Sequence, residues 1–177
     1  METYEVTVSR GRFNVRDSGN LDGFPVIMQH GWPESSYTWE PVRPFLSSQL
    51  RIIAPDLRGL GDSERTLEPE LYQKIELAKD VVDIIDDLGI KEFSLVGHDW
   101  GGNVAQEISF AIPGRVRKLV LMNFPILSNK AGNLEARKVI QSQGSVALTY
   151  QNSRNKSSAA GYSFSTHLAG GEVSFRF

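Results

Sequence analysis

Residues 97–102 read Gly-His-Asp-Trp-Gly-Gly, and this stretch decides the fold. It follows the apolar run Phe93–Val96 and leads into 103–108, where apolar residues recur with helical spacing. The order is therefore strand, tight turn and helix. Glycines stand two residues before and two residues after Asp99, where a strand and a helix must approach each other closely. The pattern predicts that the Asp99 side chain projects from the tip of the turn.

A strand, turn and helix of this kind form a nucleophile elbow, and the residue at its tip is usually Ser. Here the tip residue carries a carboxylate. A carboxylate is poorly suited to acyl transfer, but it is well suited to displacing a leaving group from an sp3 carbon, because the product is an ester that water can later cleave. We therefore predict that Asp99 is a covalent nucleophile.

The composition is that of one globular domain. The chain has 177 residues, of which 40% are hydrophobic and 23% are charged, and its formal net charge is -2. A balance so close to neutral speaks against a nucleic-acid partner. Cysteine is absent, which excludes disulfides, thiolate metal sites and cysteine nucleophiles. The N-terminus has no secretory pattern and no apolar run approaches bilayer length, so we expect a cytoplasmic protein without a membrane partner.

Short apolar segments alternate with helical patterns as far as Met122. Strands are predicted at Tyr4–Val8, Arg12–Val15, Pro25–Gln29, Arg51–Ala54, Phe93–Val96 and Val116–Met122. Helices are predicted between Trp39 and Leu50, between Leu71 and Leu88, and from the elbow to Pro113. The acidic side chains of the second helix are expected to form its solvated face: Asp80, Asp83, Asp86 and Asp87. Such alternation predicts an α/β fold with a mostly parallel sheet.

Three polar residues, His30, Asp56 and Asp99, stand at the ends of predicted strands. Ligands of parallel sheets bind beyond the carboxyl ends of the strands, so this shared placement predicts one active site. We interpret His30 and His98 as structural histidines that are hydrogen-bonded or packed, not as bases. We interpret Asp56 and Arg58 as a pair that organises its loop.

Three segments, 30–35, 56–63 and 97–102, read His-Gly-Trp-Pro-Glu-Ser, Asp-Leu-Arg-Gly-Leu-Gly-Asp-Ser and Gly-His-Asp-Trp-Gly-Gly. They resemble the His-Gly-X-Pro motif, the Asp-X-Arg-Gly-X-Gly-X-Ser loop and the nucleophile elbow of epoxide hydrolases. Asn123-Phe124-Pro125 resembles the strand end before the cap domain of that family. The chain therefore resembles the α/β-hydrolase fold, in the aspartate-nucleophile branch that epoxide hydrolases share with haloalkane dehalogenases. Residues 1–135 are predicted to be the N-terminal part of the α/β-hydrolase core.

The resemblance implies a role for each motif. Asp99 would open an epoxide to a diol through an alkyl-ester intermediate, with an oxyanion hole made by the backbone N–H groups of Trp100 and Trp32. Trp32, Pro33 and Trp100 would line the pocket of a small apolar epoxide, without a cofactor or metal ion. Trp32 stands where a dehalogenase usually has Asn, which favours the epoxide. The remaining motif residues are expected to be structural: His30, Gly31, Asp56, Arg58, Gly97, His98, Gly101 and Gly102.

The residues for the second half of the family mechanism are not recognisable. In this fold an acid and then a His follow the nucleophile along the chain, and the His activates the hydrolytic water. No Asp follows Asp99, and the candidates that the chain offers are Glu135 and the only downstream histidine, His167. Tyr150 and Tyr162 lie where the family's cap supplies two tyrosines that polarise the epoxide, but they lack recognisable flanking sequence.

Residues 136–177 are rich in Ser and show no clear periodicity. We predict an aberrant or partial cap segment that is poorly ordered, as truncation or a frameshift would produce. The cap and the last strands of the fold are expected to be missing, which would expose an apolar sheet edge and promote self-association. Three alternatives remain: an epoxide hydrolase that lacks its general base, a haloalkane dehalogenase, and a non-catalytic truncated fragment or pseudoenzyme.

Overall fold

The computed structural model describes residues 1–123, 146–150, 163–168 and 171–176. The strands are β1 (Glu2–Val8), β2 (Gly11–Asp17), β3 (Phe24–Gln29), β4 (Leu50–Pro55), β5 (Phe93–His98), β6 (Val116–Met122), β7 (Val146–Tyr150), β8 (Ser163–Leu168) and β9 (Gly171–Arg176). The α-helices are α1 (Lys74–Asp87) and α2 (Trp100–Ala111). The described residues also contain four 3-10 helices: η1 (Ser36–Trp39), η2 (Arg43–Phe45), η3 (Pro69–Tyr72) and η4 (Pro113–Arg115).

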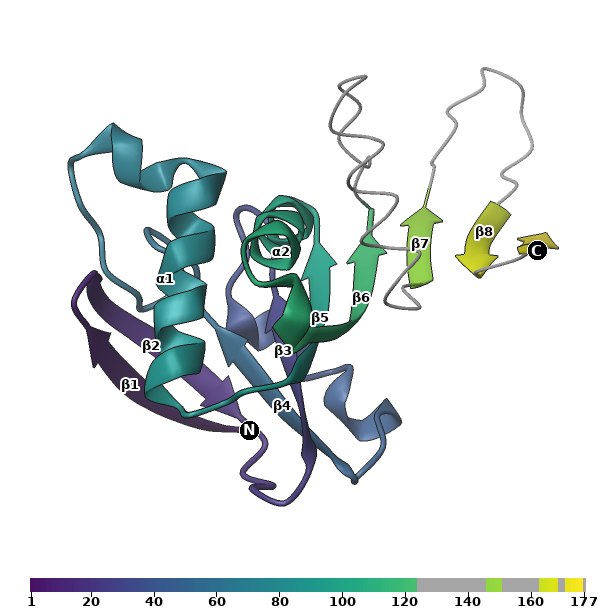
Figure 1. Ribbon diagram of the computed structural model, residues 1–177, viewed down its shortest axis with the longest axis horizontal. Helices are drawn as coiled ribbons and strands as arrows, with labels where there is room; N and C mark the ends of the chain where they lie inside the picture. The colour runs from purple at the N-terminus through teal and green to yellow at the C-terminus, as the bar shows by residue number, and fades with distance from the viewer. Residues whose placement is uncertain (124–145, 151–162, 169–170, 177) are drawn as a thin grey trace.

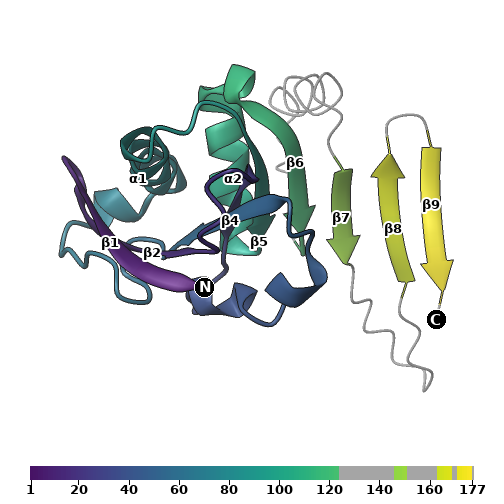
Figure 2. The same cartoon turned by 90° about the horizontal axis from the view of Figure 1, so that it is seen from below.

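The described strands form one sheet in the order β1-β2-β4-β3-β5-β6-β7-β8-β9. The five central strands, from β4 to β7, are parallel to one another. The strands at either end pair antiparallel: β1 and β2 on one side, β8 and β9 on the other. Figures 1 and 2 show β1 and β9 at opposite ends of the sheet. The predicted α/β fold with a mostly parallel sheet is confirmed.

The main core lies between the sheet and the two α-helices, which cover the same face of the sheet (Figure 1). Val104, Ala105 and Ile108 of α2 are fully buried there, beside the buried stripe of α1 that contains Leu77 and Ile84. A second cluster packs Trp39 and Leu46 against β3 and β4 on the other face. No helix in the described residues is both long and apolar enough to cross a bilayer.

The helix predicted between Trp39 and Leu50 is wrong. That segment forms only the short helices η1 and η2, and Leu50 already begins β4. Pro41 and Pro44 explain the difference, because proline cannot donate a backbone hydrogen bond inside a helix and its ring clashes with the preceding turn. Phe45, which the helical spacing placed on a buried face, is 88% exposed.

The sheet continues beyond β6 with strands that the sequence pattern did not predict. Val120, Leu121 and Met122 of β6 pair with β7, so β6 is not the open edge of the described sheet. Strands β8 and β9 have the sequences SFSTHL and GEVSFR, which lack the run of apolar residues by which a strand is usually recognised. Part of residues 136–177 lies outside the described residues, so their division as a separate segment stays a prediction, and so does self-association.

Candidate active site

Asp99 occupies the turn between β5 and α2 with backbone angles of φ 50° and ψ −118°. A positive φ is uncommon for a residue with a side chain, and such conformations concentrate at functional sites. The two glycines that frame the turn are needed for backbone contact: a Cβ at Gly97 would lie 2.4 Å from the carbonyl oxygen of Gly101, and a Cβ at Gly101 would lie 2.3 Å from that of Gln29. Strand and helix therefore touch through backbone atoms, as the elbow motif requires.

The Asp99 carboxylate faces the loop that carries Trp32. The backbone N–H of Trp32 donates a hydrogen bond to Oδ2 of Asp99 at 3.2 Å, and Gly31 lies directly against the Asp99 side chain. Trp100 begins α2, so its N–H is one of the first-turn groups without a partner inside the helix. The rings of Trp32 and Trp100 lie 6.5 Å apart between centroids, tilted by 35°. The carboxylate thus accepts the Trp32 N–H and belongs to the residue at the positive end of α2.

His30 is fully buried and both of its ring nitrogens are occupied. Nε2 accepts a hydrogen bond from the backbone N–H of Leu57 at 3.0 Å, and Nδ1 lies 2.8 Å from the carbonyl oxygen of Gly31. This arrangement fits a neutral ring with the proton on Nδ1. Burial lowers the pKa of His30 below its ordinary value of 6.5. The geometry supports the structural interpretation, because neither nitrogen is left to bind a water.

Asp56 holds together the loop of residues 56–63, here called the Asp56 loop. Its carboxylate accepts hydrogen bonds from the backbone N–H groups of Ser36 (2.6 Å) and Asp62 (3.0 Å) and from the amide of Asn14 (2.8 Å). Burial by itself would raise the pKa of Asp56, but these donors outweigh it and the net pKa is lowered. Asp56 is therefore an ionised structural group whose acceptor positions are filled.

The predicted pairing of Arg58 with Asp56 is wrong. Arg58 instead binds Asp80 of α1, at 2.8 and 2.9 Å, and donates to the carbonyl oxygen of Arg10. Arg10 also binds Asp80, at 2.7 Å. Asp80 is only 2% exposed, so it does not belong to a solvated helix face as predicted. Asp80 is spaced from Leu77 and Ile84 so that all three lie on the same face of α1. This spacing is the sequence signal that indicated a buried position for Asp80.

Glu34 is a site residue that the sequence analysis did not single out. Its Oε2 accepts a hydrogen bond from the backbone N–H of Gly31 at 3.2 Å and lies 3.4 Å from Nδ1 of His98. Glu34 thereby connects the loop of residues 30–35 to the end of β5. The only hint in the sequence was its position directly after Pro33 in the segment of residues 30–35.

An apolar cavity of about 240 Å³ opens beside the two tryptophans. Residues of the Asp56 loop, η3 and α1 complete its lining: Leu57, Arg58, Gly59, Leu60, Tyr72 and Leu77. Trp32 is 60% exposed and Trp100 is 38% exposed at its mouth. Of the three residues predicted to line the pocket, Trp32 and Trp100 line this cavity and Pro33 does not.

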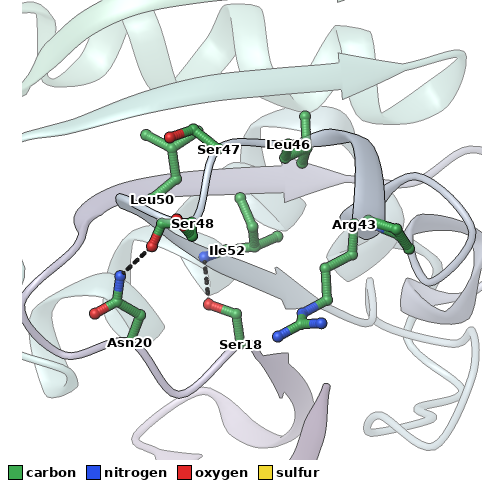
Figure 3. A pocket seen from close by; sticks show the side chains of 9 residues that line it. Ser18, Asn20, Arg43, Leu46, Ser47, Ser48, Leu50 and Ile52 are labelled. Atoms are coloured by element: carbon green, nitrogen blue, oxygen red, sulfur yellow. Dashed lines mark hydrogen bonds between the residues drawn. The ribbon is translucent and has the colours of Figure 1, made fainter.

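A second pocket lies away from Asp99, at the amino end of β4 (Figure 3). Ser18, Asn20 and Arg43 are among its lining residues, and Leu50 and Ile52 belong to the first half of the strand. Asp56 and Asp99 lie beyond the carboxyl ends of their strands, which run parallel through β3. This pocket is therefore not part of the candidate active site.

The downstream candidates are not brought to Asp99 by any described contact. Glu135 and Tyr162 lie outside the described residues. His167 belongs to β8, where its backbone pairs with Ala147 and Glu172, and Tyr150 belongs to β7. Their predicted roles stay predictions.

Comparison with known proteins agrees with this geometry. The family model described as alpha/beta hydrolase fold matches residues 25–159. A soluble epoxide hydrolase of Corynebacterium sp. (strain C12) is 40% identical over 111 residues, which cover 63% of this chain and 38% of the relative. Epoxide hydrolase 2 of Siraitia grosvenorii is 39% identical over 129 residues, covering 72% of this chain and 41% of the relative.

Solved structures give the same result. The crystal structure of an epoxide hydrolase from Vigna radiata superposes with a TM-score of 0.67 at 34% identity, covering 73% of this chain and 43% of that one. The chain spans about two fifths of the length of these relatives. Together with the elbow and the parallel sheet, these matches show that the chain belongs to the alpha/beta hydrolase fold family.

Proposed function

We propose that this chain carries the nucleophilic half of an epoxide hydrolase, with Asp99 as the nucleophile. The observation that carries the proposal is the Asp99 carboxylate at the elbow, which accepts the N–H of Trp32, a residue that also lines an apolar cavity. Members of this family whose names describe other reactions are also similar to the chain, for example a 2-hydroxymuconate semialdehyde hydrolase of Pseudomonas. The carboxylate of Asp99 favours an epoxide substrate over an acyl substrate. A carboxylate is readily alkylated by an epoxide but is a poor nucleophile for acyl transfer.

In the first step, an oxygen of Asp99 attacks a ring carbon of the epoxide. The carbon–oxygen bond of the ring breaks, its oxygen takes up a proton from a neighbouring acid or water, and Asp99 is left as an alkyl ester. The approach needs a carboxylate that is not already saturated with hydrogen bonds. Oδ2 of Asp99 accepts one bond, from Trp32, and the group is only partly buried.

In the second step, water attacks the ester carbonyl and releases the diol. The N–H groups of Trp32 and Trp100 would then receive the developing negative charge on the carbonyl oxygen, and loss of one such donor typically lowers the rate by about 100- to 1000-fold. This step needs a base. In residues 1–123 both nitrogens of His30 are occupied and His98 faces Glu34, so we propose that the ester accumulates on this chain.

Mass spectrometry after incubation with styrene oxide tests the proposal. We expect a mass increase of one epoxide molecule, located on the peptide that contains Asp99 and persistent after the epoxide is removed. The Asp99→Asn variant should show no adduct at that position. Continuous diol formation would refute the accumulation of the ester, and an unmodified Asp99 would refute the proposed function. A 1-bromoalkane in the same assay tests the haloalkane alternative.

A further inference from the structure

We propose that the second pocket, at the amino end of β4, binds a small organic carboxylate with an apolar tail. The pocket lies between the loop that contains Ser18 and Asn20 and the segment from Arg43 to Leu50, and it measures about 260 Å³ (Figure 3). It is at the opposite end of β4 from Asp56 and shares no lining residue with the cavity beside the two tryptophans. The proposal is therefore independent of the proposed function.

Arg43 gives this pocket a positive charge that no acidic residue in the described chain neutralises. Its guanidinium group forms no hydrogen bond or ion pair with any residue that the structure describes, and the described lining of the pocket includes no Asp or Glu. Two acidic residues on neighbouring segments already have partners: Asp17 binds Arg51 at 2.7 Å, and Glu40 binds Arg16 at 3.2 Å. The pocket is therefore expected to attract an anionic group from solution.

Arg43 and Ser18 both offer hydrogen-bond donors to a ligand. Oγ of Ser18 accepts a hydrogen bond from the backbone N–H of Ile52 at 3.0 Å, which leaves the hydroxyl hydrogen of Ser18 for the ligand. Figure 3 shows the Arg43 guanidinium turned toward the side of the pocket where Ser18 lies. A carboxylate only accepts hydrogen bonds, and its two oxygens match the paired N–H groups of a guanidinium. These two side chains are therefore suited to binding a carboxylate.

The two walls of the pocket are fixed to the core and to each other. Nδ2 of Asn20 donates a hydrogen bond to the carbonyl oxygen of Ser48 at 2.8 Å, and the backbone N–H of Ser18 donates to the carbonyl oxygen of Ile52 at 2.9 Å. Ile52 is only 2% exposed and belongs to the second core cluster. Because Ser18 is bonded to a core strand, its hydroxyl is held in place before a ligand binds, which lowers the entropic cost of binding.

Part of the lining is apolar, which favours an organic anion over an inorganic one. Leu46, Leu50 and Ile52 line the pocket and pack in the second core cluster. The pocket measures about 260 Å³, which exceeds the size of a carboxylate group, and an apolar cavity of about 150 Å³ is enough to hold benzene. A phosphate or sulfate ion would leave these side chains in contact with water, whereas an apolar tail would bury their surface. The single guanidinium also matches one negative charge.

A titration of the full chain with benzoate, followed by two-dimensional amide NMR, tests the proposal. We expect benzoate to shift the backbone amide signals of Ser18 and Ser48 until they saturate. Three other probes each lack one part of the ligand: acetate lacks the ring, benzyl alcohol lacks the charge, and inorganic phosphate lacks an apolar part. Each should bind at least about tenfold more weakly than benzoate. Absence of saturable shifts at these two signals, or equal binding of any of the three probes, overturns the proposal.

A variant of Arg43 separates this site from a general attraction of anions to the chain. Arg43→Gln should weaken benzoate binding at least about tenfold, because it removes charge-assisted hydrogen bonds. Arg12→Gln is the matched control: it removes the same charge from an exposed side chain outside the pocket, and binding should stay within about twofold of the wild type. The amide spectra also report whether each variant is folded.

Unchanged benzoate binding in Arg43→Gln, or an equal loss in Arg12→Gln, overturns the carboxylate site. Alkylation of Asp99 by styrene oxide should proceed at the same rate in Arg43→Gln as in the wild type, because Arg43 does not line the cavity beside the tryptophans. A slower alkylation would contradict the independence of the two sites. If Asp99 is not alkylated in the wild type, the proposed function fails, and the benzoate titration still decides the carboxylate site.

Discussion

Asp56 and Asp99 lie at the same edge of the sheet, but their surroundings differ. Asp56 is buried and its two carboxylate oxygens accept three hydrogen bonds, from Ser36, Asp62 and Asn14. Asp99 is only partly buried and accepts one hydrogen bond, from Trp32. A carboxylate whose acceptor positions are filled stabilises a loop, and one with free positions is available to an electrophile. The contrast teaches that two aspartates in equivalent places of the sequence pattern differ in the number of donors around them, which fits a structural role for Asp56 and the proposed reactive role for Asp99.

Removing Arg58 should have the largest effect, because Arg58 fixes the loop that also contains Asp56 to the buried Asp80 of α1. Arg58→Met leaves the buried Asp80 with Arg10 as its remaining ion-pair partner, and loss of a buried partner typically costs about 3–5 kcal/mol of unfolding free energy. Urea denaturation measures the change. Arg12→Met removes the exposed pair with Glu5 and should cost less than about 1 kcal/mol. A similar loss in both variants would contradict the buried network.

The next largest effect is the loss of stability in Asp56→Asn, compared with that in Asp99→Asn. Asp56→Asn places an amide NH2 against N–H donors and should lower the unfolding free energy by about 2–4 kcal/mol. Asp99→Asn keeps an oxygen for the Trp32 N–H and should change it by less than about 0.5 kcal/mol. Urea denaturation of both variants under the same conditions gives the comparison. Equal destabilisation would show that Asp99 is also a structural group, and the proposed function would lose its physical basis.

Gly31→Ala tests the proposed reactivity of Asp99, because it should displace the Asp99 carboxylate without removing it. The new Cβ would lie 2.7 Å from Cβ of Asp99 and 3.0 Å from its Oδ2, so the carboxylate must shift. Since a displacement of about 1 Å can cost roughly 100-fold in rate, we expect alkylation of Asp99 by styrene oxide to slow by about that factor. In Gly114→Ala the added Cβ meets nothing within 4 Å, and the alkylation rate should stay unchanged. An unchanged rate in Gly31→Ala would mean that the present carboxylate position is not the reactive one.

The strands up to β6, the two α-helices and the elbow could be predicted from sequence, because their signals are local. Apolar alternation and helical spacing locate the central strands, and the glycines around Asp99 locate the turn. The failures have physical causes as well. Pro41 and Pro44 interrupt an apolar spacing that otherwise predicts a helix, and β8 and β9 lack a run of apolar residues.

The candidate site could be predicted only in part. The motifs predicted the position of Asp99 at the tip of the turn, the place of Trp32 beside it and the structural role of His30. The partners of Arg58 and Glu34 could not be predicted, because each depends on elements far apart in the chain: Asp80 is 22 residues from Arg58, and His98 approaches Glu34 across the loop of residues 30–35. A salt-bridge partner is set by tertiary packing, whereas a tight turn is set by its own residues.

The smallest expected effect concerns pH and the buried His30. Because burial lowers its pKa in the folded state below 6.5, the unfolded chain takes up a proton first as the pH falls. The neutral ring therefore contributes stability above pH 6.5 that is lost progressively as the pH falls from 6.5 toward the folded-state pKa. Asp17 and Asp56 have pKa values lowered from 3.8, so they lose their contribution only in more acidic solution. Urea denaturation between pH 7 and 5.5 should show a shallower decline in His30→Asn than in the wild type. Equal slopes would mean that His30 is protonated in the folded chain, and its accepted bond from the Leu57 N–H would then be broken.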